Sequence, residues 1–448
     1  MIGPFPWDPF PPGAPEPTGD DPFLGALYRG TVQGADAYRA VRSVVRRDQG
    51  VLRVGNRFVP DGRYREVAFV ALGRAATSMG LAALHAFGDR LTQGFVAGPA
   101  DPTTALPFRG ETVGDGWGGD EAVPRVLAAA REIVGGLRES DLFLLLVSPG
   151  AVRSLLLPPP GLDPPGFATL LRELVGHGAS SSDVATVARV LGGGGVGGQL
   201  LPKQVAADVQ CLIVDRGDGP RAVGGGPTFP VGDDERERAR TALARAGRLS
   251  AVPPEAAARL VPSGTATPPA ERRPVVVAAP ADALRGAADH VFDKGWTSRV
   301  GVLGLRGGPE ESADRFLASV ESVIAAERSS GGPPSKGLVV FGTTTLDVPE
   351  GVDETPACEA FLARALGGLR RREMSLGLFR TSGPTTTPVG PGRPLAGVVI
   401  GAPGDPASKV LPGLARPIRM RGGITDVGIV VVALVPASPS APAGRASR

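Results

Sequence analysis

Three short, uninterrupted apolar runs constrain the fold of this chain more than any other feature of its sequence. VAFVAL at residues 67–72, LFLLLV at 142–147 and DVQCLIVD at 208–215 are each bounded by glycine, proline or charged residues. Continuous apolar runs of this length are typical of strands buried on both faces, as in a parallel sheet with helices on either side. The sequence therefore predicts an α/β fold.

The segments between these runs have the spacing of helices. RAATSMGLAALHAFGDRL, which follows Gly73, carries Ala, Met and Leu at helical intervals, and VPRVLAAAREIVGGLRES precedes the second apolar run. This alternation predicts a larger domain with a doubly wound, mostly parallel sheet and a smaller α/β domain after it. The expected organisation is a Pro-rich tail at 1–22, a large domain at 23–330, a small domain at 331–436 and a disordered tail at 437–448.

Composition excludes several classes of function. The 48 basic and 45 acidic side chains leave a net charge of +3, which is too small to indicate a nucleic-acid or membrane partner. The N-terminus has no basic segment followed by an apolar one, and no apolar stretch approaches the roughly 20 residues of a membrane helix. Cys211 and Cys358 are expected in the core and give no disulfide framework. These features predict a cytoplasmic protein.

Common catalytic motifs are missing from the sequence. It contains no G-x-x-x-x-G-K-[ST], H-E-x-x-H, C-x-x-C or G-x-S-x-G. His85 and His290 lie in expected helices and His177 lies at an expected helix end, so each is interpreted as solvated or capping. No residues are expected to form a metal site.

Three glycine-containing segments are candidates for phosphate binding. LGGGGVGGQL at 191–200 follows a helix, and its bare backbone N–H groups could cradle a phosphate. The alternative is a flexible loop, which we expect to be mobile without ligand because no Lys, Ser or Thr anchors it. The other candidates are GGGPTFP at 224–230 and FGTTTLDVPEG at 341–351.

The order of these pieces resembles the type II glycerate 2-kinase family, whose chains have a large N-terminal domain and a smaller C-terminal domain called MOFRL. VALGRAATSMGLAALHAFGDRLTQG at 70–94 follows the family pattern V-x-x-G-K-A-A-x-x-M-A and L-G-D-R-L-x-x-G. SPGAVRSLLLPPPGL at 148–162 aligns with S-G-G-G-S-A-L-L-x-x-P-x-x-G-L. The resemblance extends from about residue 25 to 435 and implies two domains that face each other across a cleft.

The resemblance also implies ATP-dependent phosphoryl transfer to glycerate or a related small hydroxy acid, with ATP and Mg²⁺ as cofactors. It implies Arg74, Asp215 and Glu359 as catalytic residues, with Arg74 pointing into the cleft. The residues it implies for cofactor binding are Gly73, Ser148, Gly150, Gly197, Gly226, Thr228 and Thr344.

This chain departs from the family at positions that meet phosphate. Arg74 replaces a lysine, Pro149 removes an N–H, and Val152 replaces a serine. The family arginines fall at Ala188 and Pro356, and a family lysine falls at Arg189. Because phosphoryl transfer depends on positioned cations and donors, these losses predict weak or absent activity.

Two alternatives to an active kinase stay open. One is a kinase-fold protein that binds a ligand or partner without turnover, and the other is a structural subunit paired with an active paralogue. The partners that the sequence leaves open are a small hydroxy acid, a second copy of the chain and such a paralogue.

Overall fold

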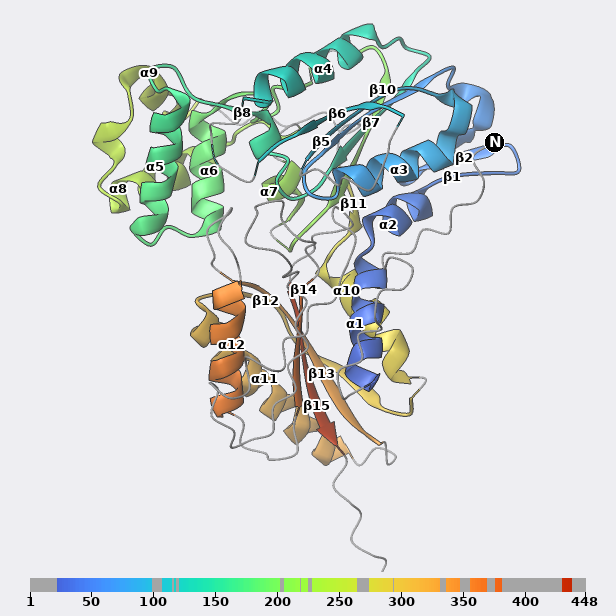
Figure 1. Cartoon of the computed structure of the whole chain (residues 1–448), viewed down its shortest axis with the longest axis vertical. Coiled ribbons are helices and arrows are strands. Elements are labelled where there is room, and N and C mark those ends of the chain that lie inside the picture. Colours follow the sequence, from blue (N-terminus) through green and yellow to red (C-terminus); the bar gives the residue numbers. More distant parts are fainter. Residues whose placement is uncertain are drawn as a thin grey trace, which may run out of the picture.

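The structure of the chain is a computed structural model that describes residues 22–98, 107–114, 117, 121–201, 205–217, 219–224, 228–263, 274–292, 294–330, 336–346, 355–368, 375–380 and 429–436. Two sheets, each with its own covering helices, account for most of these residues (Figure 1). The expected tail at 437–448 lies outside the described residues, as does the tail at 1–22 apart from Pro22, which begins the first helix.

The larger sheet has six strands, all parallel, in the order β11-β10-β7-β4-β5-β6. Every residue of the two central strands, β4 and β7, is buried, as their continuous apolar sequences predict. The strands are β4 (Val67–Leu72), β5 (Leu91–Gly98), β6 (Arg109–Thr112), β7 (Leu142–Val147), β10 (Asp208–Val214) and β11 (Val275–Ala278).

Helices cover both faces of this sheet. Phe69 and Ala71 of β4 belong to the same buried cluster as α3 (Ala76–Phe87), whereas Val70 and Leu72 belong to the cluster that contains α4 (Val123–Gly136). Because successive side chains of a strand point to opposite faces, α3 and α4 lie on opposite sides of the sheet. The doubly wound α/β prediction is confirmed.

Further helices extend both layers. α2 (Ala37–Val44) packs on the α3 side, and five helices that we call the helical cluster pack on the α4 side (Figure 1). The helical cluster comprises α5 (Pro164–Gly176), α6 (Ser181–Leu191), α7 (Pro220–Gly224), α8 (Asp233–Arg245) and α9 (Pro254–Ala257).

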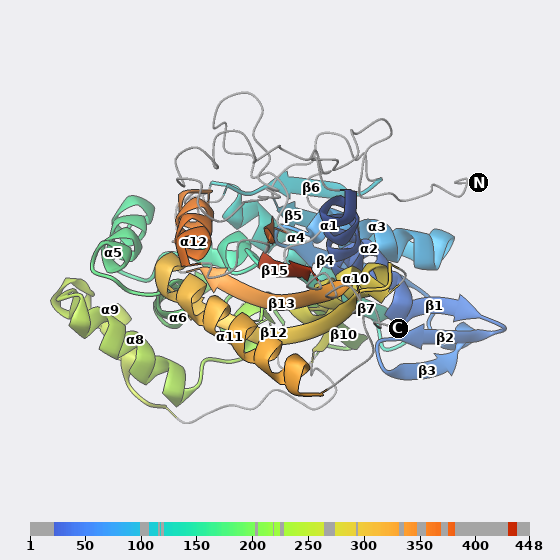
Figure 2. The ribbon, with the colours of Figure 1, turned by 90° about the horizontal axis from the view of Figure 1, so that it is seen from below.

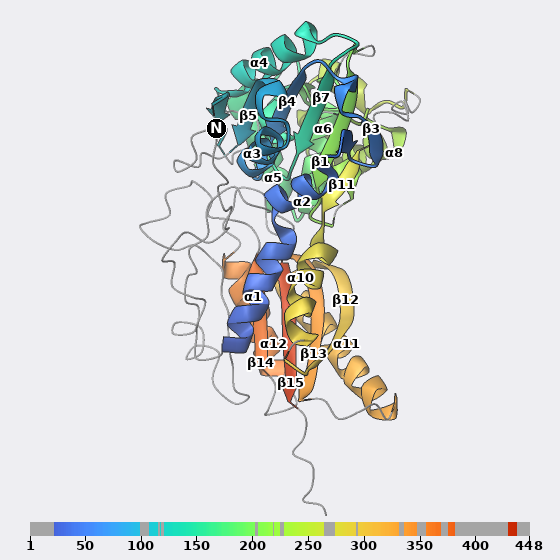
Figure 3. The same ribbon diagram turned by 90° about the vertical axis from the view of Figure 1, so that its right-hand side faces the viewer.

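The smaller sheet has four strands in the order β12-β13-β15-β14. β12 and β13 are parallel, while β15 runs antiparallel to both β13 and β14. Two helices pack on each face, with α11 and α12 on one and α1 and α10 on the other (Figure 3). The elements are β12 (Thr297–Gly307), β13 (Gly337–Leu346), β14 (Ser375–Arg380), β15 (Ile429–Pro436), α1 (Pro22–Ala35), α10 (Pro280–Phe292), α11 (Pro309–Ser330) and α12 (Thr355–Gly368).

Glycines allow α1 and α10 to pack backbone to backbone. A Cβ on Gly286 would lie 2.2 Å from the carbonyl oxygen of Gly30, and one on Gly34 would lie 2.3 Å from that of Asp282. No side chain fits between backbones this close. The helix at the start of the described chain is thereby fixed onto the smaller sheet.

The sheets divide the chain at a different place from the expected boundary between residues 330 and 331. β12 and α11 precede that boundary, yet β12 pairs with β13, and α1 also packs with the smaller sheet. A strand-helix alternation predicts that strands form but not which sheet each one joins, so the pairing of β12 with β13 could not be predicted, and the domain division at 330 stays a prediction.

Two small sheets complete the description. β1 (Val45–Asp48), β2 (Val51–Val54) and β3 (Arg57–Pro60) form an antiparallel meander that projects from the side of the larger sheet (Figure 2). β8 (Leu156–Leu157) pairs antiparallel with β9 (Gly193–Gly194). Among the described residues, no helix combines the length and the apolar character needed to cross a bilayer.

Candidate functional site

The carboxyl ends of three adjacent strands bring candidate residues together. β10, β7 and β4 are neighbours in one parallel sheet, and they are followed directly by Asp215, Ser148 and Gly73. Parallel strands present their carboxyl ends at one edge, which is where open α/β sheets bind ligands. We call these three turns the sheet edge.

The first two turns interlock through their backbones. Gly73 has φ +99°, and a Cβ there would lie 2.3 Å from the carbonyl oxygen of Ser148. The hydroxyl of Ser148 donates to Leu72 O at 3.0 Å and accepts from Ala75 N–H at 3.0 Å. Ser148 is fully buried, so its hydroxyl holds the turn that leads into α3.

Arg74 is fixed next to Gly150 in the second turn. The Arg74 N–H donates to Pro149 O at 2.8 Å, and a Cβ on Gly150, which has φ +92°, would lie 3.7 Å from Arg74 Cγ. The same Cβ position lies 3.2 Å from Nη2 of Arg153, a buried arginine whose guanidinium carbon is 6.0 Å from the centroid of the Trp117 ring. Two arginines therefore flank the Gly150 turn.

Asp215 organises the third turn. Its N–H donates to Ala278 O at 2.8 Å, and its Oδ1 accepts from the N–H groups of Gly217 and Gly219, each at 3.1 Å. Gly217 and Gly219 have φ +91° and +89°, which disfavours any side chain at either position. Asp215 is 7% exposed, so this end of the sheet carries a largely buried carboxylate.

The smaller sheet reaches the same turn. Nη2 of Arg306, near the end of β12, donates to Gly217 O at 2.7 Å. Oγ1 of Thr345, near the end of β13, donates to Arg216 O at 3.4 Å. These contacts place the carboxyl ends of β12 and β13 against the sheet edge. Arg153, Arg306 and Thr345 belong to no motif of the sequence and were not predicted as site residues.

Comparison with known proteins identifies the family. Residues 23–261, more than half of the chain, match the family described as "Domain of unknown function (DUF4147)". The chain belongs to the DUF4147 family. Glycerate kinases from Bos taurus and Homo sapiens are 27% identical over 198 residues and 28% identical over 176 residues. Membership in the type II glycerate 2-kinase family, which the resemblance implied, is confirmed by these matches.

The alignments with the bovine and human relatives cover less than half of each chain, whereas the matches to solved structures cover nearly all of it. The bovine alignment covers 40% of this chain and 37% of the relative, and the human alignment covers 36% and 33%. The crystal structure of a glycerate kinase from Thermotoga maritima covers 92% of this chain and 98% of its own, with TM-score 0.66 and 21% identity. A protein from Pyrococcus horikoshii OT3 covers 92% and 97%, with TM-score 0.65 and 21% identity. The two structures share the fold of this DUF4147 chain.

The glycine run of this DUF4147 member is closely packed. Gly193 and Gly194 form β9, and a Cβ on Gly194 would lie 2.4 Å from Leu155 O. Gly197 has φ +63°, and a Cβ there would lie 3.0 Å from Cγ2 of Val231. Close packing thus explains several of the glycines. Mobility of the run without ligand stays a prediction, and this packing disfavours it.

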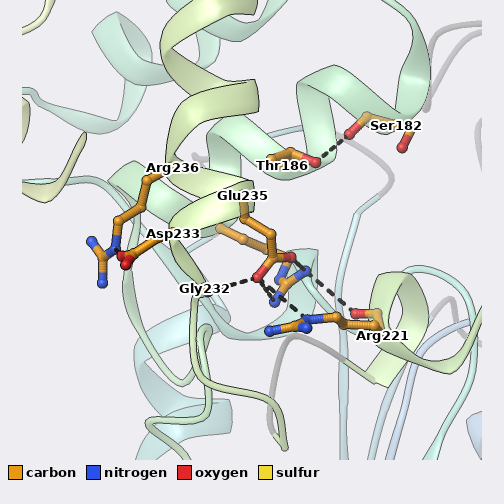
Figure 4. Close-up of polar contacts among 8 residues, drawn as sticks. Ser182, Thr186, Arg221, Gly232, Asp233, Glu235 and Arg236 are labelled. Carbon is orange, nitrogen blue, oxygen red and sulfur yellow. Dashed lines mark hydrogen bonds and ion pairs between the residues drawn. The ribbon is translucent and has the colours of Figure 1, made fainter. Parts of the chain in front are cut away.

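A buried ion pair joins α6 to the start of α8 in the helical cluster (Figure 4). Nη1 of Arg189 lies 2.5 Å from Oε1 of Glu235, and the two side chains are 4% and 2% exposed. Oε2 of Glu235 accepts from Gly232 N–H at 3.0 Å and lies 3.6 Å from Nε of Arg221. Burial lowers the pKa of Arg189, while the Glu235 carboxylate opposes that shift. Arg189 aligns with a family lysine, and here its charge is used inside the fold.

The remaining predicted site residues are dispersed. Thr344 is buried in β13, where its hydroxyl donates to Leu305 O at 3.3 Å, and Thr228 is buried beside the helical cluster. Glu359 is exposed on α12, which covers the smaller sheet. Gly226 lies outside the described residues. The structure therefore gathers Gly73, Arg74, Ser148, Gly150 and Asp215 at the sheet edge, and the roles of all the predicted site residues stay predictions.

The histidines and cysteines have local roles. Nδ1 of His85 lies 2.7 Å from the Tyr38 hydroxyl, and Nδ1 of His177 lies 2.7 Å from Glu173 O at the end of α5. Cys211 is buried, which raises the pKa of its thiol and keeps it protonated. Within the ranges that the structure describes, no three His, Cys, Asp or Glu side chains come together as a metal site.

Proposed function

We propose that this chain is a glycerate kinase-like phosphotransferase that transfers the terminal phosphoryl group of ATP to glycerate or a related small hydroxy acid. The observation that carries the proposal is the sheet edge, where Arg74 and Asp215 lie on the turns after β4 and β10, the two parallel strands that flank β7, and the smaller sheet contacts the same edge. An anionic nucleotide and a carboxylate substrate both need cations and backbone donors, which such an edge supplies. Family membership supports the same reaction.

The reaction requires positioning and charge stabilisation more than covalent chemistry. The substrate hydroxyl oxygen forms a bond to the terminal phosphorus and loses its proton to water, while the bond from that phosphorus to the bridging oxygen breaks and ADP leaves. Arg74, at the start of α3, is placed to stabilise the phosphoryl charge together with the helix N-terminus. Gly73 and Gly150 keep side chains away from this approach.

Mg²⁺ neutralises the phosphates in reactions of this kind, usually through one or two carboxylates together with phosphate oxygens. Asp215 brings a carboxylate to the sheet edge, and its Oδ1 already accepts two backbone hydrogen bonds. Carboxylates are the protein ligands that Mg²⁺ commonly uses, so we assign Asp215 the role of holding this cation. Glu359, exposed on α12, stays a predicted catalytic residue.

Turnover is expected to be weak. Pro149 offers no N–H and its carbonyl is occupied by Arg74 N–H, Val152 offers no hydroxyl, and the Ser148 hydroxyl is engaged within the fold. Removal of a single transition-state donor costs about 10²–10³ in rate. These same observations favour a second candidate function, a non-catalytic protein that binds a ligand or an active paralogue through the kinase fold.

Calorimetric titration with ATP and Mg²⁺, then with D-glycerate, followed by a turnover assay, separates these functions. ATP-dependent phosphorylation of glycerate that Arg74→Ala abolishes and Arg74→Lys, which restores the family residue, retains would support the kinase. Arg240→Ala, which alters an exposed arginine paired with Glu237, is the matched control. Binding without turnover would support the second function. If neither ATP nor glycerate binds, the kinase is rejected, and only a non-catalytic protein that binds another ligand or an active paralogue is left.

A further inference from the structure

The smaller sheet contacts the turn that holds Asp215 from a direction opposite to the carboxylate. Arg306 and Thr345 are paired residues in the parallel register of β12 and β13, so their side chains arise side by side at the carboxyl end of the smaller sheet. They donate to two consecutive carbonyl groups, those of Gly217 and Arg216. One pair of residues on adjacent strands of the smaller sheet therefore binds two consecutive carbonyl groups of the turn after β10.

One peptide group connects these contacts with Asp215. The Arg216 carbonyl that accepts from Thr345 and the Gly217 N–H that donates to Asp215 Oδ1 belong to the same planar peptide. In a trans peptide the C=O and N–H point in opposite directions, so a bond on one side fixes the direction of the bond on the other. Hydrogen bonds in such a chain also polarise one another.

Gly217 needs this support more than most residues. Its φ of +91° is held by the hydrogen bonds around it, because glycine itself favours no single backbone conformation. The Asp215 carboxylate accepts from the Gly217 N–H, and on the side of the smaller sheet the Arg306 guanidinium donates to the Gly217 carbonyl oxygen at 2.7 Å. A bond from a charged donor is stronger than a neutral one, so Arg306 supplies most of the outer restraint and Thr345, at 3.4 Å, supplies less.

We propose that Arg306 and Thr345 are positioning residues that act from the smaller sheet on the turn after Asp215. Thr345 holds the Arg216–Gly217 peptide, Arg306 holds the adjoining Gly217 carbonyl, and together they fix the Asp215 carboxylate at the sheet edge. Neither side chain needs to touch the substrate. The inference rests on the proposed function for its consequence in catalysis, but the restraint on the turn does not depend on turnover. Through this restraint, the orientation of the Asp215 carboxylate depends on where the smaller sheet lies.

The test uses the full chain and the double variant Arg306→Ala/Thr345→Val, with amide hydrogen exchange as the first measurement. Loss of both bonds should speed exchange of the Gly217 and Gly219 amides about tenfold, since two hydrogen bonds at typical net strength exceed the energy of one tenfold step. Arg299→Ala is the matched control, because Arg299 is an exposed arginine of the same strand that pairs with Glu327 instead. It should leave both amides unchanged.

Kinetics provide the second measurement. The double variant should lower kcat about tenfold while KM for ATP and for glycerate changes less than twofold, and Arg306→Ala/Thr345→Ser should recover part of kcat because serine keeps the hydroxyl. Unchanged exchange at Gly217 and Gly219 overturns the proposal, as does faster exchange with unchanged kcat. If the wild type neither binds nor phosphorylates glycerate, the proposed function fails, and the exchange result alone decides whether the two residues hold the turn.

Discussion

The sheet edge and the helical cluster both bury polar groups, but they satisfy them in different ways. At the sheet edge, the Ser148 side chain binds backbone groups of the neighbouring turn and the Asp215 side chain binds those of its own turn, so the polar atoms fix loop geometry. In the helical cluster, Arg189 and Glu235 bind each other, so opposite charges hold two helices together. The first arrangement holds the turns and the Asp215 carboxylate at the edge where open α/β sheets bind ligands, whereas in the second the two charges neutralise each other inside the fold.

This difference separates residues that the family motifs group together. Arg74 and Arg189 both align with family lysines, but only Arg74 lies on a turn at the carboxyl edge of the sheet. Gly73 and Gly197 both have positive φ, yet the first meets the backbone of another turn and the second meets the Val231 side chain. Function should therefore depend on the sheet edge, and stability should depend on both regions.

Gly73→Ala should give the largest effect and tests how tightly the sheet edge is interlocked. The new Cβ would lie 2.3 Å from Ser148 O, in a backbone conformation that L residues avoid, so we expect a loss of about 4 kcal/mol in the free energy of unfolding. Gly178→Ala is the matched control, since φ there is +79° with no atom within 4 Å of the added Cβ. It should cost about 1–2 kcal/mol. Chemical denaturation of both variants measures the difference, and equal losses would show that the turns are not interlocked.

Glu235→Gln tests the helical cluster and should cost about 3 kcal/mol. The substitution leaves Arg189 buried without its counter-charge, although glutamine can still accept from Gly232 N–H. Glu237→Gln, in the same helix, breaks an ion pair with Arg240 that is 56% exposed on each side and should leave stability unchanged within error. Denaturant midpoints of the two variants decide the matter. A stable Glu235→Gln protein would mean that the buried charges contribute no net stabilisation.

Ser148→Ala tests the neutral bonds at the sheet edge and should cost about 2 kcal/mol, because it leaves the Ala75 N–H and a lone pair of Leu72 O buried without their partner. Ser312→Ala is the matched control. Ser312 is also fully buried, but its Oγ has no hydrogen-bond partner within the described part of the chain, so its loss should be neutral or slightly stabilising. A cost at Ser312 equal to that at Ser148 would mean that packing, not hydrogen bonding, explains both.

The sequence predicted the larger sheet well because its signals are local. VAFVAL and LFLLLV became β4 and β7 as expected, and Gly73 marks the turn between β4 and α3. Local signals could not show which sheet β12 would join, because a strand pattern contains no information about its partner. The resulting boundary at 330 therefore cuts across the smaller sheet.

The candidate site was predictable in its positions but not in its contacts. The resemblance located Ser148 and Asp215, but their hydrogen bonds depend on strand register, which no motif states. Arg306 and Thr345 are 89 and 129 residues from the carbonyl groups they bind, and nothing in the intervening sequence indicates the contact. The ion pair of Arg189 could not be predicted from nearby residues, because its partner, Glu235, is 46 residues away.

The smallest expected effect is the pH dependence of stability, which should differ between the partly buried His85 ring and the buried charge of Arg189. Burial, with a contribution from Arg42, lowers the pKa of His85 from its ordinary value of 6.5, so the fold favours the neutral ring that contacts Tyr38. Below about pH 6.5 the unfolded chain binds the proton more readily, and stability should fall as the pH drops toward the folded pKa. Arginine does not lose its proton in this range, so the Arg189 guanidinium should add no slope there.

Denaturation of the wild type and His85→Gln between pH 7.5 and about 5 measures this effect, because glutamine at that position cannot titrate. The wild type should lose stability over that interval and the variant should lose less, while the carboxylates whose pKa is lowered by arginine partners, such as Asp61, titrate at lower pH. Parallel curves for the two proteins would place the pH dependence elsewhere. In that case His85, which lies in α3, would not contribute to the pH dependence of stability.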